Sequence, residues 1–310
     1  MLVEEELAAI SPEKDMFLTI GVFDGVHLGH RYLISKLKEA AKQNNCLSGV
    51  ITFRWHPLEV LAPGTAPPYL TSSEEKVALL RAEKVDHAIP LSFTAELANL
   101  TAREFIGLLQ KYLRMRGLVV GPDFTLGKDR EGTISVLREL GEETGFSVTV
   151  VEFKNLSGEV VSSTAIRQHL AQGEILNVSR MLGRTFSLQG PVIKGDGRGK
   201  ILGFPTANIE VDSVQSLLPE GVYATRVVID GISYRSVTNI GKRPTFGDNE
   251  RNVEIYVIDF QGDLYGKELK LDIVDLLRGE KKFDSPDDLK RQITEDITRA
   301  KSLLGKTPDR

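Results

Sequence analysis

Short apolar runs alternate with helical patterns through the first half of the chain, from residue 17 to about residue 153. Between the runs, apolar residues such as Phe105, Leu109 and Leu113 recur every four positions, which is the spacing of one helix face. This alternation predicts a parallel sheet with helices on its faces, and therefore an α/β domain. The expected strands are 17–21, 48–53, 85–91, 117–121 and 147–153.

Four helices have recognisable starts. Residues 71–74 and 101–104 each match a capping box, in which a hydroxyl and an acid three positions later bond each other's backbone N–H groups. A further helix is expected over residues 163–173. The last helix of the chain is expected to begin with Ser285 as its N-cap and Pro286 at the first helical position.

The second half of the chain has a different sequence pattern, because its strand-like runs follow one another without helical segments. Leu269, Leu271 and Ile273 alternate with charged residues, as in a half-buried strand, and Asp230-Gly231 is a typical hairpin turn. We therefore expect a small antiparallel barrel or sandwich, followed by the C-terminal helix. The expected strands are 185–194, 221–230, 233–240, 252–260 and 267–276.

Length and charge narrow the possibilities. A chain of 310 residues exceeds what one hydrophobic core usually supports, and 41% apolar residues are enough for two cores. We place the domain boundary where the pattern of predicted elements changes, which gives domains 1–183 and 184–310. The formal net charge of −4 argues against a broad grip on a nucleic-acid backbone, so any phosphate binding is expected to be local.

The remaining composition favours a cytoplasmic protein without a membrane partner. A single cysteine, Cys46, excludes an intramolecular disulfide and fits a reducing compartment. The acidic N-terminal residues do not resemble a secretory signal, and no apolar run approaches the ~20 residues of a membrane span. The sequence gives no indication of the oligomeric state.

The first candidate site is the segment 21–30, which joins a predicted strand to a predicted helix. Its glycines let the backbone approach a phosphate, and the N–H groups of a helix N-terminus attract an anion. His27 and His30 are three residues apart, so both are expected to face the same anion and to stabilise charge on phosphorus. An exposed, idle histidine pair is the alternative interpretation. The members of this candidate phosphate site are Gly21, Phe23, Asp24, Gly25, His27 and His30.

Two further segments follow predicted strands of the same domain. Asp123 and Phe124 lie in a loop at the carboxyl end of a strand, where ligands of parallel sheets bind. Ser163 and Thr164 begin a helix that carries Arg167 one turn later, so that hydroxyls and a guanidinium form a second phosphate clamp. A glycine-rich turn and a plain N-cap are the alternative interpretations of these two segments.

The second candidate site spans residues 195–208. Its glycines and cations have the composition of a loop that covers phosphates, and Thr206 and Asn208 are spaced to hold one Mg²⁺ from an extended segment. Glu254 is expected to share a strand face with Tyr256 and Ile258, where a carboxylate suits a general base. A flexible loop and an exposed glutamate are the alternatives. The phosphate-covering residues are Gly195, Gly197, Arg198, Gly199 and Lys200.

These motifs carry two resemblances. The His-x-Gly-His block resembles the signature of the nucleotidyltransferase superfamily. Over nearly its whole length, the chain resembles the prokaryotic bifunctional riboflavin kinase/FMN adenylyltransferase (FAD synthetase) family. The matching blocks occur in the family's order, and they are residues 21–30, 162–167, 203–208, 239–246, 263–266 and 277–283.

The resemblance implies a Rossmann-like nucleotidyltransferase domain followed by a riboflavin kinase barrel. The barrel domain would use ATP and Mg²⁺ to convert riboflavin to FMN, with Glu254 as base and Thr206 and Asn208 as metal ligands. The N-terminal domain would join FMN to AMP from a second ATP, giving FAD and pyrophosphate. Nucleotide or flavin contacts are then expected from His56, Asp123, Phe124 and Arg278.

One departure from the family pattern concerns residues 53–57. Members usually carry an acid and a proline where this chain has Arg54 and Trp55, although His56 and Pro57 are kept. The main alternative is therefore a riboflavin kinase whose N-terminal domain binds nucleotide without transferring it efficiently. A regulatory nucleotide-binding protein and a class I aminoacyl-tRNA synthetase are disfavoured, the latter because its Lys-Met-Ser-Lys-Ser motif is missing.

Overall fold

The computed structural model describes residues 3–195, 199, 202–242 and 251–305. The chain divides into two compact units, Met1–Ser163 and Thr164–Arg310. Helices α8 (Ser163–Gln172) and α9 (Ile175–Leu182) thereby group almost entirely with the second unit, whereas the boundary expected from sequence follows α9. Among the described residues, no helix combines the length and apolarity required to cross a membrane.

The first unit contains a parallel sheet of five strands, and each of them was predicted from the sequence. In the strand order β3-β2-β1-β4-β5, β2 and β3 lie on one side of β1, and β4 and β5 lie on the other. A crevice therefore opens at the carboxyl ends of β1 and β4, where the direction of winding changes. The strands are β1 (Met16–Gly21), β2 (Leu47–Phe53), β3 (His87–Leu91), β4 (Met115–Val120) and β5 (Ser147–Val150).

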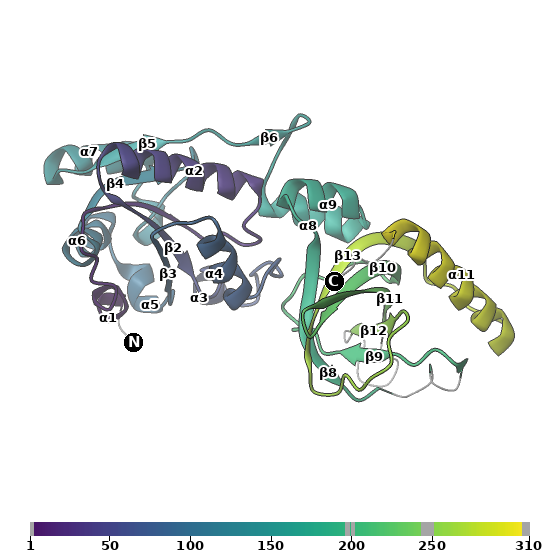
Figure 1. Cartoon of the computed structure of the whole chain (residues 1–310). Helices are drawn as coiled ribbons and strands as arrows, with labels where there is room; N and C mark the ends of the chain where they lie inside the picture. Colours follow the sequence, from purple (N-terminus) through teal and green to yellow (C-terminus); the bar gives the residue numbers. More distant parts are fainter. Residues whose placement is uncertain (1–2, 196–198, 200–201, 243–250, 306–310) are drawn as a thin grey trace. The chain divides into compact units, whose positions relative to one another are not determined.

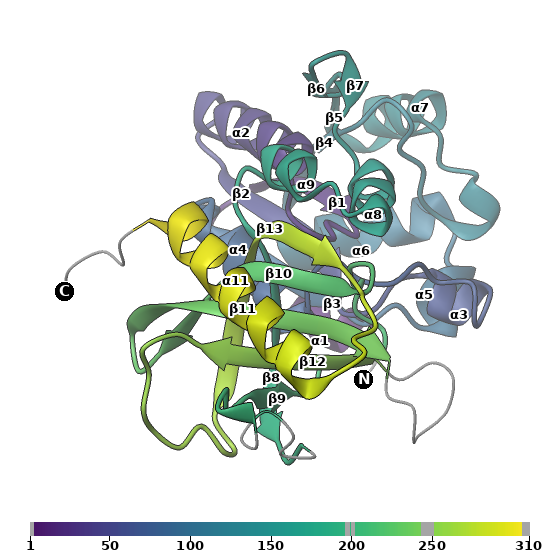
Figure 2. The same ribbon diagram turned by 90° about the vertical axis from the view of Figure 1, so that its right-hand side faces the viewer.

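Helices cover both faces of this sheet (Figure 1). Met16, Leu18 and Ile20 of β1 pack with one helix group, and Phe17 packs with the other, as the alternation along a strand requires. The first group is α1 (Val3–Ala8), α5 (Ala95–Asn99), α6 (Ala102–Leu113) and α7 (Ile134–Thr144), and the second is α2 (Leu28–Gln43) and α4 (Ser73–Ala82). A short helix, α3 (Leu58–Leu61), follows β2, and a hairpin of β6 (Asn155–Leu156) and β7 (Glu159–Val160) extends from the unit (Figures 1 and 2).

The two predicted capping boxes have different outcomes. Thr101 and Glu104 form the expected reciprocal box at the start of α6. The box predicted over residues 71–74 is wrong, because Ser72 is the N-cap of α4 and accepts a hydrogen bond from the Glu75 N–H. Thr71 has a different role, since its hydroxyl accepts a hydrogen bond from Gly25 in a distant loop.

The second unit contains a closed antiparallel barrel, so the sandwich alternative is excluded. The strand order around the barrel is β10-β11-β12-β9-β8-β13. Five strands match the prediction, including the Asp230-Gly231 hairpin between β10 and β11. The short strand β9 was not predicted as a separate strand. The six are β8 (Phe186–Ile193), β9 (Ala207–Ile209), β10 (Gly221–Ile229), β11 (Ile232–Lys242), β12 (Arg251–Val257) and β13 (Glu268–Gly279).

The predicted C-terminal helix α11 (Pro286–Leu304) lies across the outer face of β10, β11 and β13 (Figure 2). Ser285 caps it as expected, by accepting a hydrogen bond from the Asp288 N–H. Ala300 and Leu304 pack with Val222 and Ala224 of β10. One outer face of the barrel is therefore apolar and covered.

Candidate active sites

The loop between β1 and α2 holds the two predicted histidines side by side. His27 is the N-cap of α2, and its Nδ1 accepts a hydrogen bond from the His30 N–H at 3.2 Å. The two rings stack with their centroids 3.6 Å apart, and Phe23 meets His30 edge-on at 5.0 Å. Phe23 and Val26 have positive φ angles of 51° and 36°. Such backbone strain persists only where the surroundings hold it, and it is typical of ligand loops.

Asp24 fixes the shape of this loop. Its buried carboxylate accepts hydrogen bonds from the N–H groups of Leu70 and Thr71 and from the Thr71 hydroxyl. The hydroxyl of Ser163 donates to the Asp24 carbonyl oxygen at 2.9 Å. With Gly25 bound to Thr71, the loop is attached to the segment before α4 at two successive residues. The structure thus gives Asp24 a supporting role in the loop.

His30 has a neutral ring with one nitrogen that is unpaired among the described residues. Burial lowers its pKa well below the ordinary 6.5, and the nearby His27 and Lys76 lower it further, so the ring is neutral at pH 7. Its Nδ1 is inaccessible to solvent and has no hydrogen-bond partner in the described part of the chain. An unpaired buried nitrogen costs free energy.

A cavity of about 530 Å³ opens at the carboxyl ends of the parallel strands. Three predicted residues, Gly21, Asp123 and Phe124, line it. Its walls are largely apolar and aromatic, as a flat ring ligand would require. The apolar wall residues are Phe53, Pro57, Leu61, Phe93, Leu97 and Phe105, and the polar Asp129 and Arg130 line the same cavity. The sequence had not indicated most of these residues as part of a site.

The remaining predicted residues of the first site have more varied positions. His56 lies beside the cavity residue Pro57, where its N–H donates to the Tyr69 hydroxyl and its Nδ1 accepts from Leu58. The unusual Arg54 pairs with Glu6 at 3.8 Å, and Trp55 is 56% exposed. Thr164 and Arg167 belong to α8 in the second compact unit, and their contact with nucleotide stays a prediction.

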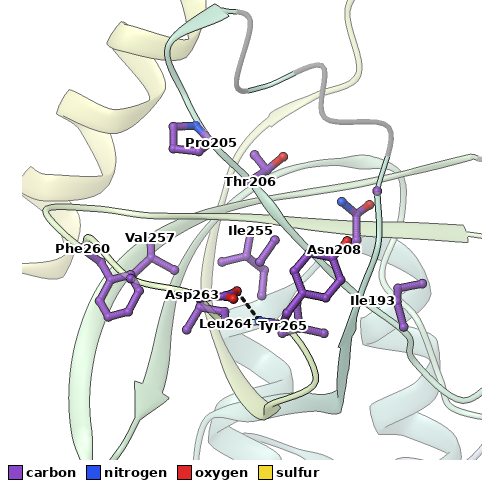
Figure 3. Close-up of a pocket in the computed structure, with 14 residues that line it drawn as sticks. Ile193, Pro205, Thr206, Asn208, Ile255, Val257, Phe260, Asp263, Leu264 and Tyr265 are labelled. Carbon is purple, nitrogen blue, oxygen red and sulfur yellow. Dashed lines mark hydrogen bonds between the residues drawn. The ribbon is translucent and has the colours of Figure 1, made fainter.

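The barrel has its own cavity, of about 250 Å³, at the segment that contains β9 (Figure 3). Thr206 and Asn208, the predicted metal ligands, both line it, and their binding of a metal stays a prediction. A Cβ atom at Gly195 would lie 2.0 Å from the Asn208 amide nitrogen, and one at Gly199 would lie 2.3 Å from the Phe204 carbonyl oxygen. A side chain at Gly199 would therefore clash with backbone, and one at Gly195 would require the Asn208 side chain to move. The predicted Gly197, Arg198 and Lys200 lie outside the described residues.

Glu254 lies directly opposite Asn208 in the register between β12 and β9. Its neighbours Val253 and Ile255 are buried, so Glu254 lies on the opposite, outer face of the strand, where Tyr256 packs near α11, as expected. Asn252 donates a hydrogen bond to its carboxylate at 2.5 Å. Glu254 itself does not line the described cavity.

The same register row continues to Arg278. Glu254 is opposite Asn239 of β11, Asn239 is opposite Val222 of β10, and Val222 is opposite Arg278 of β13. The guanidinium of Arg278 pairs with the buried carboxylate of Asp296 on α11 at 2.9 Å. The sequence had not indicated Asp296, because the contact joins two elements that are distant in the chain.

Comparisons with known proteins agree with the division into two domains. The FAD synthetase family model matches residues 9–165, and the riboflavin kinase family model matches residues 182–304. A bifunctional riboflavin kinase/FMN adenylyltransferase of Escherichia coli strain K12 is 38% identical over 301 residues, which are 96% of this chain and 95% of that protein. The chain belongs to the bifunctional riboflavin kinase/FMN adenylyltransferase family. Its α/β unit is the FAD synthetase domain, and its barrel is the riboflavin kinase domain.

Membership holds across distant relatives. The enzyme of the same name from Pseudomonas fluorescens is 38% identical over 94% of each chain, and that from Listeria monocytogenes is 32% identical over 94% of this chain and 93% of its own. A solved structure described as a macrolide-efflux protein from Streptococcus pneumoniae matches with a TM-score of 0.86 and 30% identity, over 94% of this chain and 95% of that one. The match spans both domains of the family.

Proposed function

We propose that the barrel phosphorylates riboflavin at the site marked by Glu254, Thr206 and Asn208, and that the α/β domain adenylylates the resulting FMN at the site marked by His27 and His30. Family membership supports the two activities, and the geometry supports the assignment of residues. The observation that carries the assignment is that Asn208 and Glu254 are register partners, which brings an oxygen donor for a cation next to a carboxylate base.

In the barrel, Glu254 would accept the proton of the riboflavin hydroxyl as that oxygen attacks the γ-phosphorus of ATP. The hydrogen bond from Asn252 holds its carboxylate in one orientation. The Thr206 hydroxyl and Asn208 amide oxygen are hard donors at one cavity, which fits Mg²⁺. When bound there, Mg²⁺ would neutralise charge on the ATP phosphates.

In the α/β domain, the apolar cavity would hold the flavin ring system and the histidine loop would hold the ATP phosphates. The phosphate oxygen of FMN attacks the α-phosphorus, and pyrophosphate leaves. His27 and His30 would donate hydrogen bonds to the charge that builds on phosphorus, for which the N–H group of a neutral imidazole is suited. The stacked rings and the Asp24 contacts fix these donors before the substrate arrives.

The barrel's product is thus the acceptor for the α/β domain. A chain with kinase activity alone is the second candidate, because Arg54 and Trp55 replace the acid and proline usual in the family. The purified protein should be incubated with riboflavin, ATP and Mg²⁺, and the flavins separated over time. We expect FMN to rise first and then to be replaced by FAD, whereas FMN that accumulates without FAD would establish the kinase alone.

A further inference from the structure

Lys76 is a fully buried lysine in the α/β domain, with only 2% of its surface exposed. It lies in the first half of α4 and extends toward the sheet. Lysine is rarely buried, because removing an ammonium group from water costs on the order of several kcal/mol unless other polar groups replace the water. No role in the reaction described above accounts for a charge at this position.

The ammonium group of Lys76 holds the end of β2. Its Nζ donates a hydrogen bond to the Phe53 carbonyl oxygen at 2.5 Å, and this is its one hydrogen bond or ion pair among the residues that the structure describes. Phe53 is the last residue of β2, lines the apolar cavity and meets the cavity residue Phe93 edge-on at 5.2 Å. Lys76 therefore fixes a wall of the cavity expected to hold the flavin.

The same ammonium group acts on the phosphate loop. The charge of Asp24 favours the protonated form of Lys76, and the charge of Lys76 lowers the pKa of His30. Burial lowers the pKa of Lys76 to about 8, so the group is still mainly protonated at pH 7. Moreover, Asp24 binds Leu70 and Thr71, the residues just before α4. Helix α4 is thus connected to the histidine loop by hydrogen bonds and to the flavin cavity through Lys76.

An uncharged side chain such as methionine would fill this position without the cost of burying a charge. The three donors of an ammonium group are also more than a single carbonyl oxygen uses. Both observations indicate that the positive charge of Lys76, and not only its volume, has a function. A positive charge buried near His27 and His30 favours a bound triphosphate and acts strongly in a medium of low dielectric constant.

We propose that Lys76 is a positioning residue of the adenylyl transfer site, which fixes the Phe53 wall of the acceptor cavity and supplies positive charge near the His27–His30 loop. The inference rests on the proposed function of the α/β domain. Lys76 acts through Phe53, His30 and the field at the phosphates, without forming a bond to a reacting atom. Its removal should therefore slow adenylyl transfer more than it weakens FMN binding.

The test compares Lys76→Met and Lys76→Arg with Lys38→Met. Lys38 is a suitable control, because its Nζ also donates to a backbone carbonyl oxygen, that of Glu83, at 2.6 Å. For each variant, kcat and KM for FMN and ATP are measured in adenylyl transfer, riboflavin phosphorylation is measured in the same preparation, and folding is followed by thermal unfolding. We expect Lys76→Met to lower the adenylyl transfer kcat by about 10-fold or more, Lys76→Arg to restore most of it, and Lys38→Met to change it less than about 2-fold.

A pH profile separates the charge from the packing and remains informative if Lys76→Met does not fold. The titratable groups that face Lys76 are Asp24 of the loop and His30 of α2, and β2 contributes only a carbonyl oxygen. The adenylyl transfer rate of the unmodified protein should fall as pH rises through about 8, whereas that of Lys76→Arg should persist to higher pH, because a guanidinium stays protonated. Equal activity of Lys76→Met and the unmodified protein, or identical alkaline limbs with Lys76→Arg, would overturn the proposal. Failure of the unmodified protein to form FAD would instead refute the proposed function itself.

Discussion

Asn208 and Glu254 lie opposite each other on neighbouring antiparallel strands of the barrel. Side chains of such a pair point to the same face, with Cβ atoms about 4.5–5.5 Å apart. The register continues through Asn239 and Val222 to Arg278, which is anchored to Asp296 of the C-terminal helix. The barrel thereby aligns residues from the glycine-rich segment, the candidate base and the last strand in one row.

Glu254→Gln should abolish riboflavin phosphorylation and leave adenylyl transfer intact. The amide keeps the shape and the hydrogen-bonding capacity of the side chain but cannot act as a base, so we expect the kinase kcat to fall by about 100-fold or more. Conversion of supplied FMN to FAD should continue at the unmodified rate. Glu268→Gln, at an exposed position of β13, is the control. Equal loss of both activities would refute two independent sites.

The stability of the α/β domain should fall in acid partly because of His30. Its pKa is lowered in the folded protein, so below about pH 6.5 the unfolded chain binds a proton that the folded chain does not. Folding is therefore favoured above the ordinary pKa and becomes less favourable as pH falls below it. His30→Gln should lose less stability than the unmodified protein between about pH 7.5 and pH 5.5, as measured by urea unfolding. A loss equal to that of the unmodified protein would contradict the neutral state of His30 in the folded protein, and His87→Gln serves as the control.

Phe93→Ala should weaken acceptor binding at the α/β domain alone. Phe93 lines the apolar cavity and packs edge-on against Phe53, so truncation removes an aromatic wall. Loss of one such contact is worth about 1–1.5 kcal/mol, or about 10-fold in the KM for FMN. The KM for riboflavin in the kinase reaction should be unchanged, and Leu176→Ala, at an exposed position of α9, should alter neither value. An unchanged KM for FMN would show that the flavin does not bind in this cavity.

Local sequence patterns were sufficient to predict most of the fold. The five parallel strands and five of the six barrel strands are continuous apolar or alternating runs, which can be recognised within one window of sequence. β9 has only three residues, Ala207–Ile209, and follows a glycine-dense segment, so its pairing with β12 and β8 decides its structure. Thr71 shows the same limit, because the distant Asp24 and Gly25 bind its backbone and hydroxyl.

The candidate sites were predictable to the extent that they are contiguous motifs. His27 and His30 lie in one turn, and Thr206 and Asn208 lie in one short segment. The apolar cavity, by contrast, takes Phe53, Phe93 and Phe105 from separate elements, and only the strand order of the sheet brings them together. Lys76 could not be distinguished from an ordinary surface lysine of an amphipathic helix, because its burial depends on the end of β2.

The most direct test of the central claim mixes two single variants. Glu254→Gln supplied with riboflavin should make neither FMN nor FAD, and His30→Ala should accumulate FMN with at least about a 100-fold loss of FAD formation. The two variants together, given riboflavin, ATP and Mg²⁺, should form FAD, because FMN released by one barrel serves the α/β domain of the other protein. FAD formation by either variant alone from riboflavin at the unmodified rate would contradict the assignment of the two chemistries to these two residues.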